Sequence, residues 1–329
     1  APPYCAAKSA AFTLPGGQVV GNGTLARAAG DGAAFRRSPE FDGTVLALAA
    51  GLIGELKLGQ GAAPDLISIG LSATDYVGHA FGPGGQEMCL QLISLDRDLG
   101  DFLRFLDLTR LDYALVLTAD HGALDIPERL RARGVKDAAW ADSGLAASAV
   151  GAAVGQQLGL KGPVLIGDLS GDIFIDDGLS AADQARALDA AVAAYRARPQ
   201  VEAVFTKAEL AAAPLPAGPP ANWSLIERVR ASFDPRRSGD LYVVLKREVM
   251  PIAAPSSGYV STHGSPWDYD RKVPIIFWRR PQFPKASAEA ADTVDILPTL
   301  AAALGLEFAP GSVDGRCLPA FANVACPTR

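Results

Sequence analysis

Two short apolar runs, each ending in a polar loop, constrain the fold of this chain more than any other feature of its sequence. The first run spans residues 65–71 and leads into a loop with Asp75, and the second spans residues 113–118 and leads into a loop with Asp120. A segment with helical periodicity, residues 87–106, separates the two runs. Strands that alternate with helices in this way form parallel sheets, and ligand sites lie at the carboxyl ends of those strands. We therefore expect an α/β fold with Asp75 and Asp120 at one edge of its sheet.

Short strand and helix signals alternate between residues 147 and 250, a pattern typical of a compact α+β unit. The expected elements are a helix at 38–58 before the first apolar run and, in the later unit, a strand at 171–175, a helix at 180–196, a strand at 201–205, a helix at 223–230 and a strand at 241–245. An apolar strand at 273–278 and a helix at 293–300 indicate that the main sheet resumes afterwards. We predict a core at 1–146, an insertion at 147–250 and a return to the core at 251–329.

The acidic composition argues against a protein that binds nucleic-acid polymers. The net charge is −6, and no stretch concentrates the Lys and Arg residues that a phosphate backbone requires. The sequence also lacks an apolar run of about eighteen residues, so we expect no membrane span. Its first residues do not have the pattern of a signal peptide, although a secreted protein whose signal has been removed gives the same result.

The four cysteines allow two disulfide bonds. Cys317 and Cys326 are close enough in sequence to close a short loop, and Cys5 and Cys89 are available to pair across the fold. Four buried thiols are the alternative, because no CxxC spacing is present. Disulfides would suit a periplasmic or secreted protein. The sequence favours that location over a reducing compartment.

Only three histidines are present, and each lies in a short polar motif at the end of an expected strand or in a loop. His79 lies four residues after Asp75, a spacing that places both side chains on one face of a helical turn. Zinc prefers imidazole and carboxylate ligands, and a catalytic zinc has three protein ligands, a count that Asp75, His79 and His263 satisfy. The neighbours Asp120 and His121 fill half of a second site. Two metal ions about 4 Å apart suit hydrolysis of a phosphoester.

Five ordered motifs of the chain resemble the alkaline phosphatase superfamily. They lie at residues 72–79, 117–122, 263–270, 294–299 and 313–316. The resemblance is greatest to the bacterial branch that uses a threonine nucleophile, which is similar to nucleotide pyrophosphatase/phosphodiesterases. It implies a three-layer α/β/α sandwich with a mostly parallel sheet, of which this chain lacks the N-terminal part. The α+β unit at 147–250 would be an insertion or cap on that core.

The resemblance also implies a pair of zinc ions. One ion would be bound by Asp75, His79 and His263. The other would be bound by Asp120, His121 and two further ligands, an aspartate and the nucleophilic threonine. In the family both further ligands precede the motif that carries Asp75, and no residue of this chain matches them. We therefore expect the catalytic nucleophile to lie outside this chain.

The first residues of the chain give no substitute for that nucleophile. Ser9, Thr13 and Thr24 neither follow a strand nor open a helix, as an activated hydroxyl would require. Lys8 does not match the Lys and Arg with which the monoesterase branch binds phosphate. We therefore expect negligible phosphatase turnover from these residues alone.

Zinc-dependent hydrolysis of phosphate monoesters is the function that the resemblance favours for the parent protein. The substrate would be a small phosphate ester, and inorganic phosphate would be a product. Two alternatives stay open, a phosphodiesterase or nucleotide pyrophosphatase and an inactive fragment that only binds metal. The preference for monoesters or diesters depends on residues upstream of this chain.

Four residues near the motifs have two equally good interpretations. They are Tyr76, Ser265, Asp268 and Asp270. Each of them either orients a metal ligand, because metal-bound imidazoles usually donate their second nitrogen to a carboxylate or carbonyl, or caps a loop. The sequence alone does not separate these roles.

Overall fold

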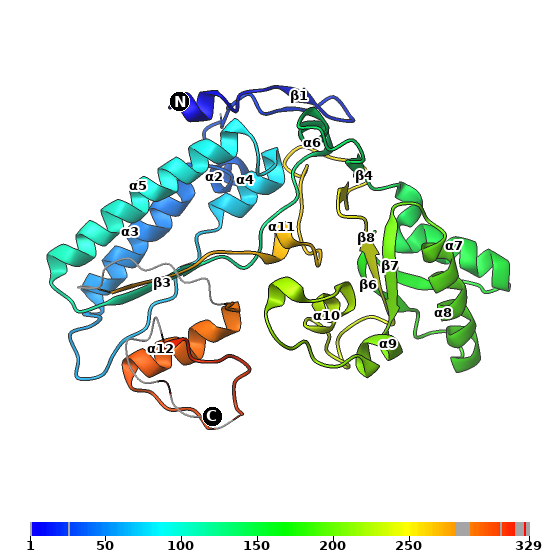
Figure 1. Ribbon diagram of the computed structural model, residues 1–329. Coiled ribbons are helices and arrows are strands. Elements are labelled where there is room, and N and C mark those ends of the chain that lie inside the picture. Colours follow the sequence, from blue (N-terminus) through cyan, green and yellow to red (C-terminus); the bar gives the residue numbers. More distant parts are fainter. Residues whose placement is uncertain (1, 26, 280–289, 310, 320–325, 327–329) are drawn as a thin grey trace.

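The computed structural model of the chain describes residues 2–25, 27–279, 290–309, 311–319 and 326. Figure 1 shows a helical region with a two-stranded ladder on one side and a separate sheet with its own helices on the other. The N-terminal segment runs along the top of the helical region as far as α6 (Pro127–Ala132). Among the described residues, no helix is long and apolar enough to cross a membrane.

Two long helices form the helical region. Helix α3 (Pro39–Glu55) and helix α5 (Gln86–Thr109) lie side by side, as Figure 1 shows. Leu46, Ala49 and Ile53 recur at helical spacing, so they share one face of α3 and pack against Phe102 and Leu106 of α5. Both helices confirm the helical periodicity seen in the sequence.

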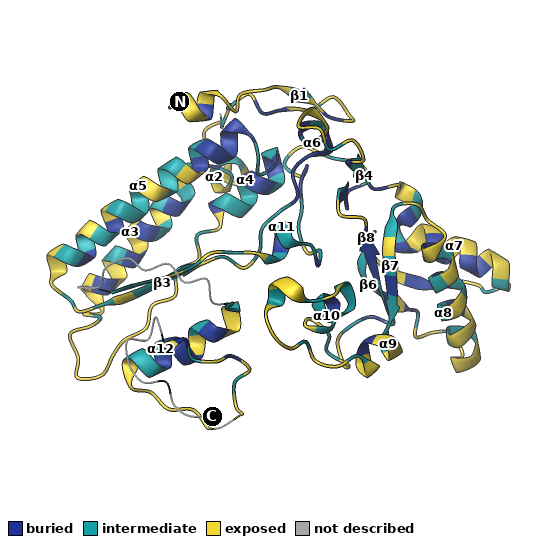
Figure 2. Cartoon of the chain, in the orientation of Figure 1, coloured by how far each residue is buried: buried dark blue, intermediate teal, exposed yellow. Residues whose placement is uncertain are grey.

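Helix α4 (Ala73–Phe81) packs against both of these helices and begins directly after an extended segment. Figure 2 shows α4 largely buried or half-buried, whereas the extended segment between α3 and α4 is exposed. This segment contains residues 65–71, for which the apolar run predicted a buried strand. That prediction is wrong: the segment is no strand, and Leu66 is 79% exposed. A strand needs a hydrogen-bonded neighbour, and none of the described strands pairs with these residues.

The second predicted strand is present as β3 (Ala114–Thr118), and it pairs with β10 (Ile275–Arg279). The pairing is antiparallel, with Thr118 opposite Ile275. The end of β3 and the start of β10 therefore lie together, which brings the loops after residue 118 and before residue 275 to the same place. The expected mostly parallel sheet is not found: within the described part of the chain, parallel pairing joins only β4 (Ala139–Trp140) and β9 (Val249–Met250).

The predicted α+β unit contains a four-stranded antiparallel sheet. Its strands, in spatial order, are β5 (Leu165–Gly167), β6 (Gly171–Ile175), β8 (Leu241–Leu245) and β7 (Val201–Thr206). Its helices are α7 (Ala147–Leu158), α8 (Ala181–Arg196), α9 (Lys207–Ala212) and α10 (Leu225–Arg230). The strands and helices predicted between residues 171 and 245 are all confirmed.

Alternation along β8 explains how this sheet is covered on both faces. Val243 belongs to the cluster formed with α7 and α8, where Tyr195 is fully buried. Its neighbour Val244 belongs to the cluster with Leu210 and Val229, which come from α9 and α10. Successive side chains of a strand point to opposite faces, so one strand contributes to two cores. The domain boundaries at residues 147 and 250 stay a prediction.

The remaining elements are short. They are α1 (Pro3–Ala6), β1 (Phe12–Thr13), β2 (Val19–Val20), α2 (Gly32–Arg36), α6 (Pro127–Ala132), α11 (Asp268–Arg271), α12 (Ile296–Leu304) and three 3-10 helices, η1 (Ser143–Leu145), η2 (Pro220–Asn222) and η3 (Thr293–Asp295). The predicted final helix at 293–300 is confirmed as η3 followed by α12.

All four cysteines are paired. Cys5 bonds to Cys89 at the start of α5, and Cys317 bonds to Cys326. The preferred interpretation of the sequence is therefore confirmed, and the alternative of four thiols is wrong. A second contact fixes the N-terminal segment near the first bridge, because the buried Glu87 accepts hydrogen bonds from the backbone amides of Gly21 and Gly23.

Candidate metal centre

Helix α4 places the first two candidate ligands. Asp75 and His79 lie one turn apart on it, and the distance from Asp75 Oδ1 to His79 Nε2 is 3.4 Å. The spacing in the sequence predicted this arrangement. The first amides of a helix have no partner within the helix, and here the buried Asp42 of α3 accepts a hydrogen bond at 2.9 Å from the amide of Ala73, the first residue of α4. The helix that carries both side chains is thereby fixed to its neighbour.

Two loops bring the other histidines to the same carboxylate. His121 follows β3, and its Nε2 lies 3.8 Å from Asp75 Oδ1. His263 precedes β10 along the chain, and its Nε2 lies 3.5 Å from the same oxygen. The rings of His121 and His263 stack with centroids 3.3 Å apart. Three imidazoles thus converge on one carboxylate oxygen from separate parts of the sequence.

Asp120 lies at the open edge of this cluster. Its Oδ2 is 3.6 Å from His121 Nε2, and 88% of its side chain is exposed. Asp75, His79 and His263 form the tighter group, since their ligand atoms all lie within 4.8 Å of one another. The structure therefore brings together all five residues singled out in the sequence, while their division between two metal ions stays a prediction.

Hydrogen bonds to backbone carbonyls orient two of the imidazoles. His79 Nδ1 donates to the carbonyl oxygen of Ser261 at 2.6 Å, and His121 Nδ1 donates to that of Gly122 at 2.9 Å. A carbonyl oxygen only accepts, so each Nδ1 carries a proton, and in the neutral form of either ring Nε2 is the nitrogen with the lone pair. Those Nε2 atoms are the ones that face Asp75. Metal-binding histidines are typically oriented in this way.

Burial lowers the pKa of His263, and the neighbouring His121 and His79 lower it further. The carboxylates of Asp75 and Asp270 act in the opposite direction but do not reverse the shift. A lowered pKa keeps this imidazole neutral at neutral pH. Only a neutral imidazole offers the lone pair that a metal ion needs.

The structure separates the two roles considered for the neighbouring residues. Asp268 pairs with Arg271, Lys272 and Arg228, so it has a structural role. Tyr76 packs edge-on against Phe41 on the surface of α3 and α4.

Asp270 and Ser265 form a different arrangement. Asp270 is buried and accepts hydrogen bonds from the amide and hydroxyl of Ser265, two residues after His263. Burial raises the pKa of the Asp270 carboxyl.

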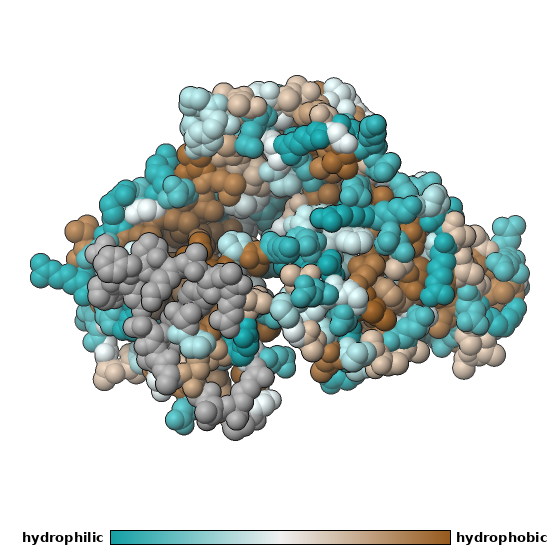
Figure 3. Space-filling model, in the orientation of Figure 1, coloured by the Kyte–Doolittle hydropathy of each residue, from teal (hydrophilic) through white to brown (hydrophobic). Residues whose placement is uncertain are grey.

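A cavity of about 1170 Å³ adjoins the cluster. The candidate ligands line one part of it, and apolar side chains line another, among them Leu71, Leu92, Val294 and Leu297. Figure 3 shows a hydrophobic surface over α4 and α5 on the side that faces the C-terminal helix. The site therefore has room for a large ester or for additional polypeptide.

The sequence analysis missed Asp42 and Gln91. Gln91 Nε2 donates to Asp42 Oδ2 at 3.0 Å, and both residues are fully buried. The available signal was a carboxylate inside the apolar periodicity of the segment that became α3. A buried acid of this kind needs a donor, and here the donors are Gln91 and the first amide of α4.

Gly122→Ala is expected to displace the loop that carries His121. A Cβ at this position would overlap the carbonyl oxygen of Tyr269, and the backbone cannot yield as a side chain would. We expect a loss of about 1–3 kcal/mol in the free energy of unfolding, as for other overpacked positions. Urea unfolding measures it. The matched control is Gly70→Ala, where a Cβ meets nothing within 4 Å. Equal stability of the two variants would contradict the prediction.

The fold and the cluster define an α/β protein with a candidate metal centre built from helix α4 and the loops next to a strand pair. The model of the type I phosphodiesterase / nucleotide pyrophosphatase family matches residues 5–266, so the chain belongs to this family of the alkaline phosphatase superfamily. The resemblance stated from the motifs is thereby confirmed.

Individual relatives agree with this assignment. The chain is 50% identical over 311 residues to alkaline phosphatase PhoK of Sphingomonas sp, a match that covers 94% of this chain and 56% of the relative. It is 44% identical to alkaline phosphatase PhoD of Zymomonas mobilis, covering 100% of this chain and 58% of the relative. A crystal structure of a substituted alkaline phosphatase PafA matches with a TM-score of 0.74 and 25% identity, covering 88% of this chain and 53% of that one. The chain thus spans little more than half the length of these relatives.

Proposed function

We propose that this chain forms part of a zinc-dependent phosphoester hydrolase of the alkaline phosphatase type. The observation that carries the proposal is the convergence of three imidazoles on the carboxylate of Asp75. Imidazole nitrogens and carboxylate oxygens are the ligands that zinc prefers. The names and identities of PhoK and PhoD support a phosphatase in particular.

The residues divide between two zinc ions in this proposal. Asp75, His79 and His263 hold one ion, and Asp120 and His121 contribute to the other. When bound, a pair of such ions neutralises the charge that develops on the phosphoryl oxygens. The part of this chain is to hold the ligands and keep His79 and His121 in the tautomer that leaves Nε2 free.

The nucleophile and the two remaining ligands belong, in this proposal, to polypeptide outside the 329 residues. The match to only 56–58% of the length of PhoK and PhoD supports this assignment. The same polypeptide would complete a three-layer sandwich with a mostly parallel sheet. It would also give the exposed segment at 65–71 a strand to pair with.

Zinc-dependent hydrolysis tests the proposal directly. We expect negligible release of nitrophenol from p-nitrophenyl phosphate by this chain with saturating zinc. The protein made from the complete coding sequence is expected to hydrolyse the same monoester. Elemental analysis separately measures the zinc bound per chain. It distinguishes the two causes of low turnover, an absent metal site and an absent nucleophile. Rapid turnover by the chain alone would contradict the assignment of the nucleophile.

A phosphodiesterase or nucleotide pyrophosphatase is the second candidate. The description of the matching family and the large cavity beside the ligands favour it. A diester needs space for a substituent on both sides of the phosphorus, which a cavity of about 1170 Å³ supplies. Bis(p-nitrophenyl) phosphate distinguishes the two functions: faster turnover of this diester than of the monoester supports the second candidate.

The two disulfide bonds support a periplasmic or secreted location. Disulfides persist in oxidising compartments and are rare where thiols are kept reduced. Both pairs, Cys5 with Cys89 and Cys317 with Cys326, are formed in this chain. Fractionation of cells into periplasm and cytoplasm, followed by detection of the protein, tests this part of the proposal.

A further inference from the structure

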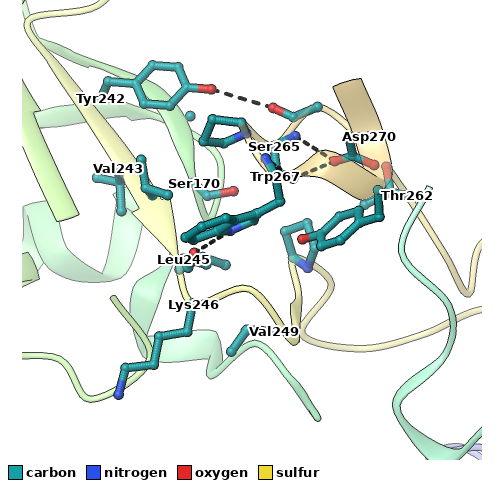
Figure 4. A pocket seen from close by; sticks show the side chains of 16 residues that line it. Ser170, Tyr242, Val243, Leu245, Lys246, Val249, Thr262, Ser265, Trp267 and Asp270 are labelled. Carbon is teal, nitrogen blue, oxygen red and sulfur yellow. Dashed lines mark hydrogen bonds between the residues drawn. The ribbon is translucent and has the colours of Figure 1, made fainter. Parts of the chain in front are cut away.

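One carboxylate near the metal centre is buried without a counter-charge. Asp270 is only 3% exposed, and one of its oxygens, Oδ2, accepts hydrogen bonds from Ser265 N at 2.8 Å and Ser265 Oγ at 2.6 Å. Figure 4 shows these bonds from Ser265 to the carboxylate of Asp270. The other oxygen, Oδ1, is buried and has no hydrogen-bond partner within the described residues. Such an orphaned acceptor is costly to bury.

The neighbouring carboxylate of Asp268 differs in this respect, because the Lys and Arg side chains close to Asp270 in the sequence pair with Asp268 instead. Asp268 forms ion pairs with Arg228, Arg271 and Lys272. Across the described ranges, Asp270 has no ion pair with any Lys or Arg. A buried anion without a cationic partner is strongly unfavourable, so its retention points to a positive charge that the side chains do not supply.

Asp270 also contacts both loops that carry the loop histidines. Its backbone oxygen accepts a hydrogen bond at 2.6 Å from the amide of Gly122, the residue after His121. Its side chain holds Ser265, two residues after His263. Asp270 is therefore hydrogen-bonded to both segments that carry the stacked imidazoles, the one with His121 and the one with His263.

We propose that Asp270 is a positioning residue of the metal centre, whose carboxylate balances the charge of the bound cations and fixes the loop of His263. This inference rests on the proposed metal site. The cations would supply the positive charge that is missing among the side chains near Asp270. Each of the two imidazoles would then lie between a metal ion and a segment that Asp270 holds in place.

Other contacts hold the same loop independently of the carboxylate. Trp267 Nε1 donates to the carbonyl oxygen of Leu245 at 3.0 Å, and Tyr242 donates to that of Gly264 at 3.5 Å, as Figure 4 shows. Both contacts join the loop to strand β8 of the α+β unit. The loop therefore keeps two anchors when Asp270 becomes asparagine, whose carbonyl oxygen accepts the same bonds from Ser265.

The test compares Asp270→Asn with Asp268→Asn in the full 329-residue chain, using Zn²⁺ and Co²⁺ alone as probes. We expect Asp270→Asn to weaken binding of both ions by about 10–100-fold, the usual cost of losing an outer partner of a metal ligand. At saturation its Co²⁺ absorption bands should shift. Its melting temperature without metal should equal or exceed that of the unsubstituted chain, while its melting temperature with saturating zinc should be lower. Asp268→Asn should leave metal affinity unchanged.

A purely structural role predicts a different result. Asp270→Asn would then melt earlier, or fail to fold, without metal, and would gain as much stability from zinc as the unsubstituted chain does. Either outcome overturns the inference. Ser265→Ala keeps the negative charge and removes one hydrogen bond, so its metal affinity should stay within about threefold, well below the loss expected for an outer partner. Failure of the unsubstituted chain to bind zinc would instead overturn the proposed function.

Discussion

Replacing Asp75 with asparagine is expected to weaken zinc binding by at least about 100-fold, more than the usual effect of an outer partner. The Oδ1 atom of Asp75 lies 3.4, 3.8 and 3.5 Å from the Nε2 atoms of His79, His121 and His263. It is the one negative charge common to all three imidazoles in the described structure. Without it, the imidazoles have no shared anion to offset the charge of the ion.

Competition with a chromophoric chelator measures the zinc affinity of this variant, and elemental analysis gives the zinc bound per chain. The matched control is Asp96→Asn, which removes the same charge from an exposed position on α5. The control should bind zinc as the unsubstituted chain does. Equal affinity of Asp75→Asn and Asp96→Asn would show that the imidazoles converge for a structural reason.

The candidate site was largely predictable because histidine is rare in this chain. Three histidines are present in all, so their motifs were easy to single out. The pair Asp75 and His79 followed from helical spacing alone. The approach of His263, which is 188 positions from Asp75 in the numbering, did not follow from spacing: it was predicted from the number of ligands that a catalytic zinc takes and from the resemblance to a family. Asp42 escaped notice because a carboxylate inside an apolar helix gives no local sign of its partner.

The fold was predictable where local patterns decide it. Strand β8 contributes side chains to two cores, so its sequence is a short continuous apolar run of strand length. The run at 65–71 is also rich in apolar residues, yet most of it is exposed in the structure. Strand formation there depends on a hydrogen-bonded neighbour, and apolar composition does not supply one. The antiparallel direction of β3 against β10 was likewise beyond the reach of periodicity.

Removing the disulfide between Cys5 and Cys89, by replacing both with serine, is expected to lower the free energy of unfolding by about 4–5 kcal/mol. The two residues are 84 positions apart, and a bridge over a loop of this length restricts the unfolded chain strongly. The bridge also ties α1 to α5, close to the bonds from Gly21 and Gly23 to Glu87. Further along the N-terminal segment, Leu14 and Val20 pack against Ile126 and Val260. Urea unfolding of the variant measures the loss.

The second disulfide provides the matched comparison. Cys317 and Cys326 are only 9 positions apart, so replacing both with serine should cost about 2–3 kcal/mol by the same loop argument. The difference between the two variants isolates the effect of loop length, because the chemical change is identical. A larger loss from the short loop than from the long one would mean that local packing, and not the restriction of the unfolded chain, dominates. Helix α5 would then hold the N-terminal segment mainly through Glu87. In that case Glu87→Gln should lower the free energy of unfolding more than removal of the disulfide between Cys5 and Cys89 does.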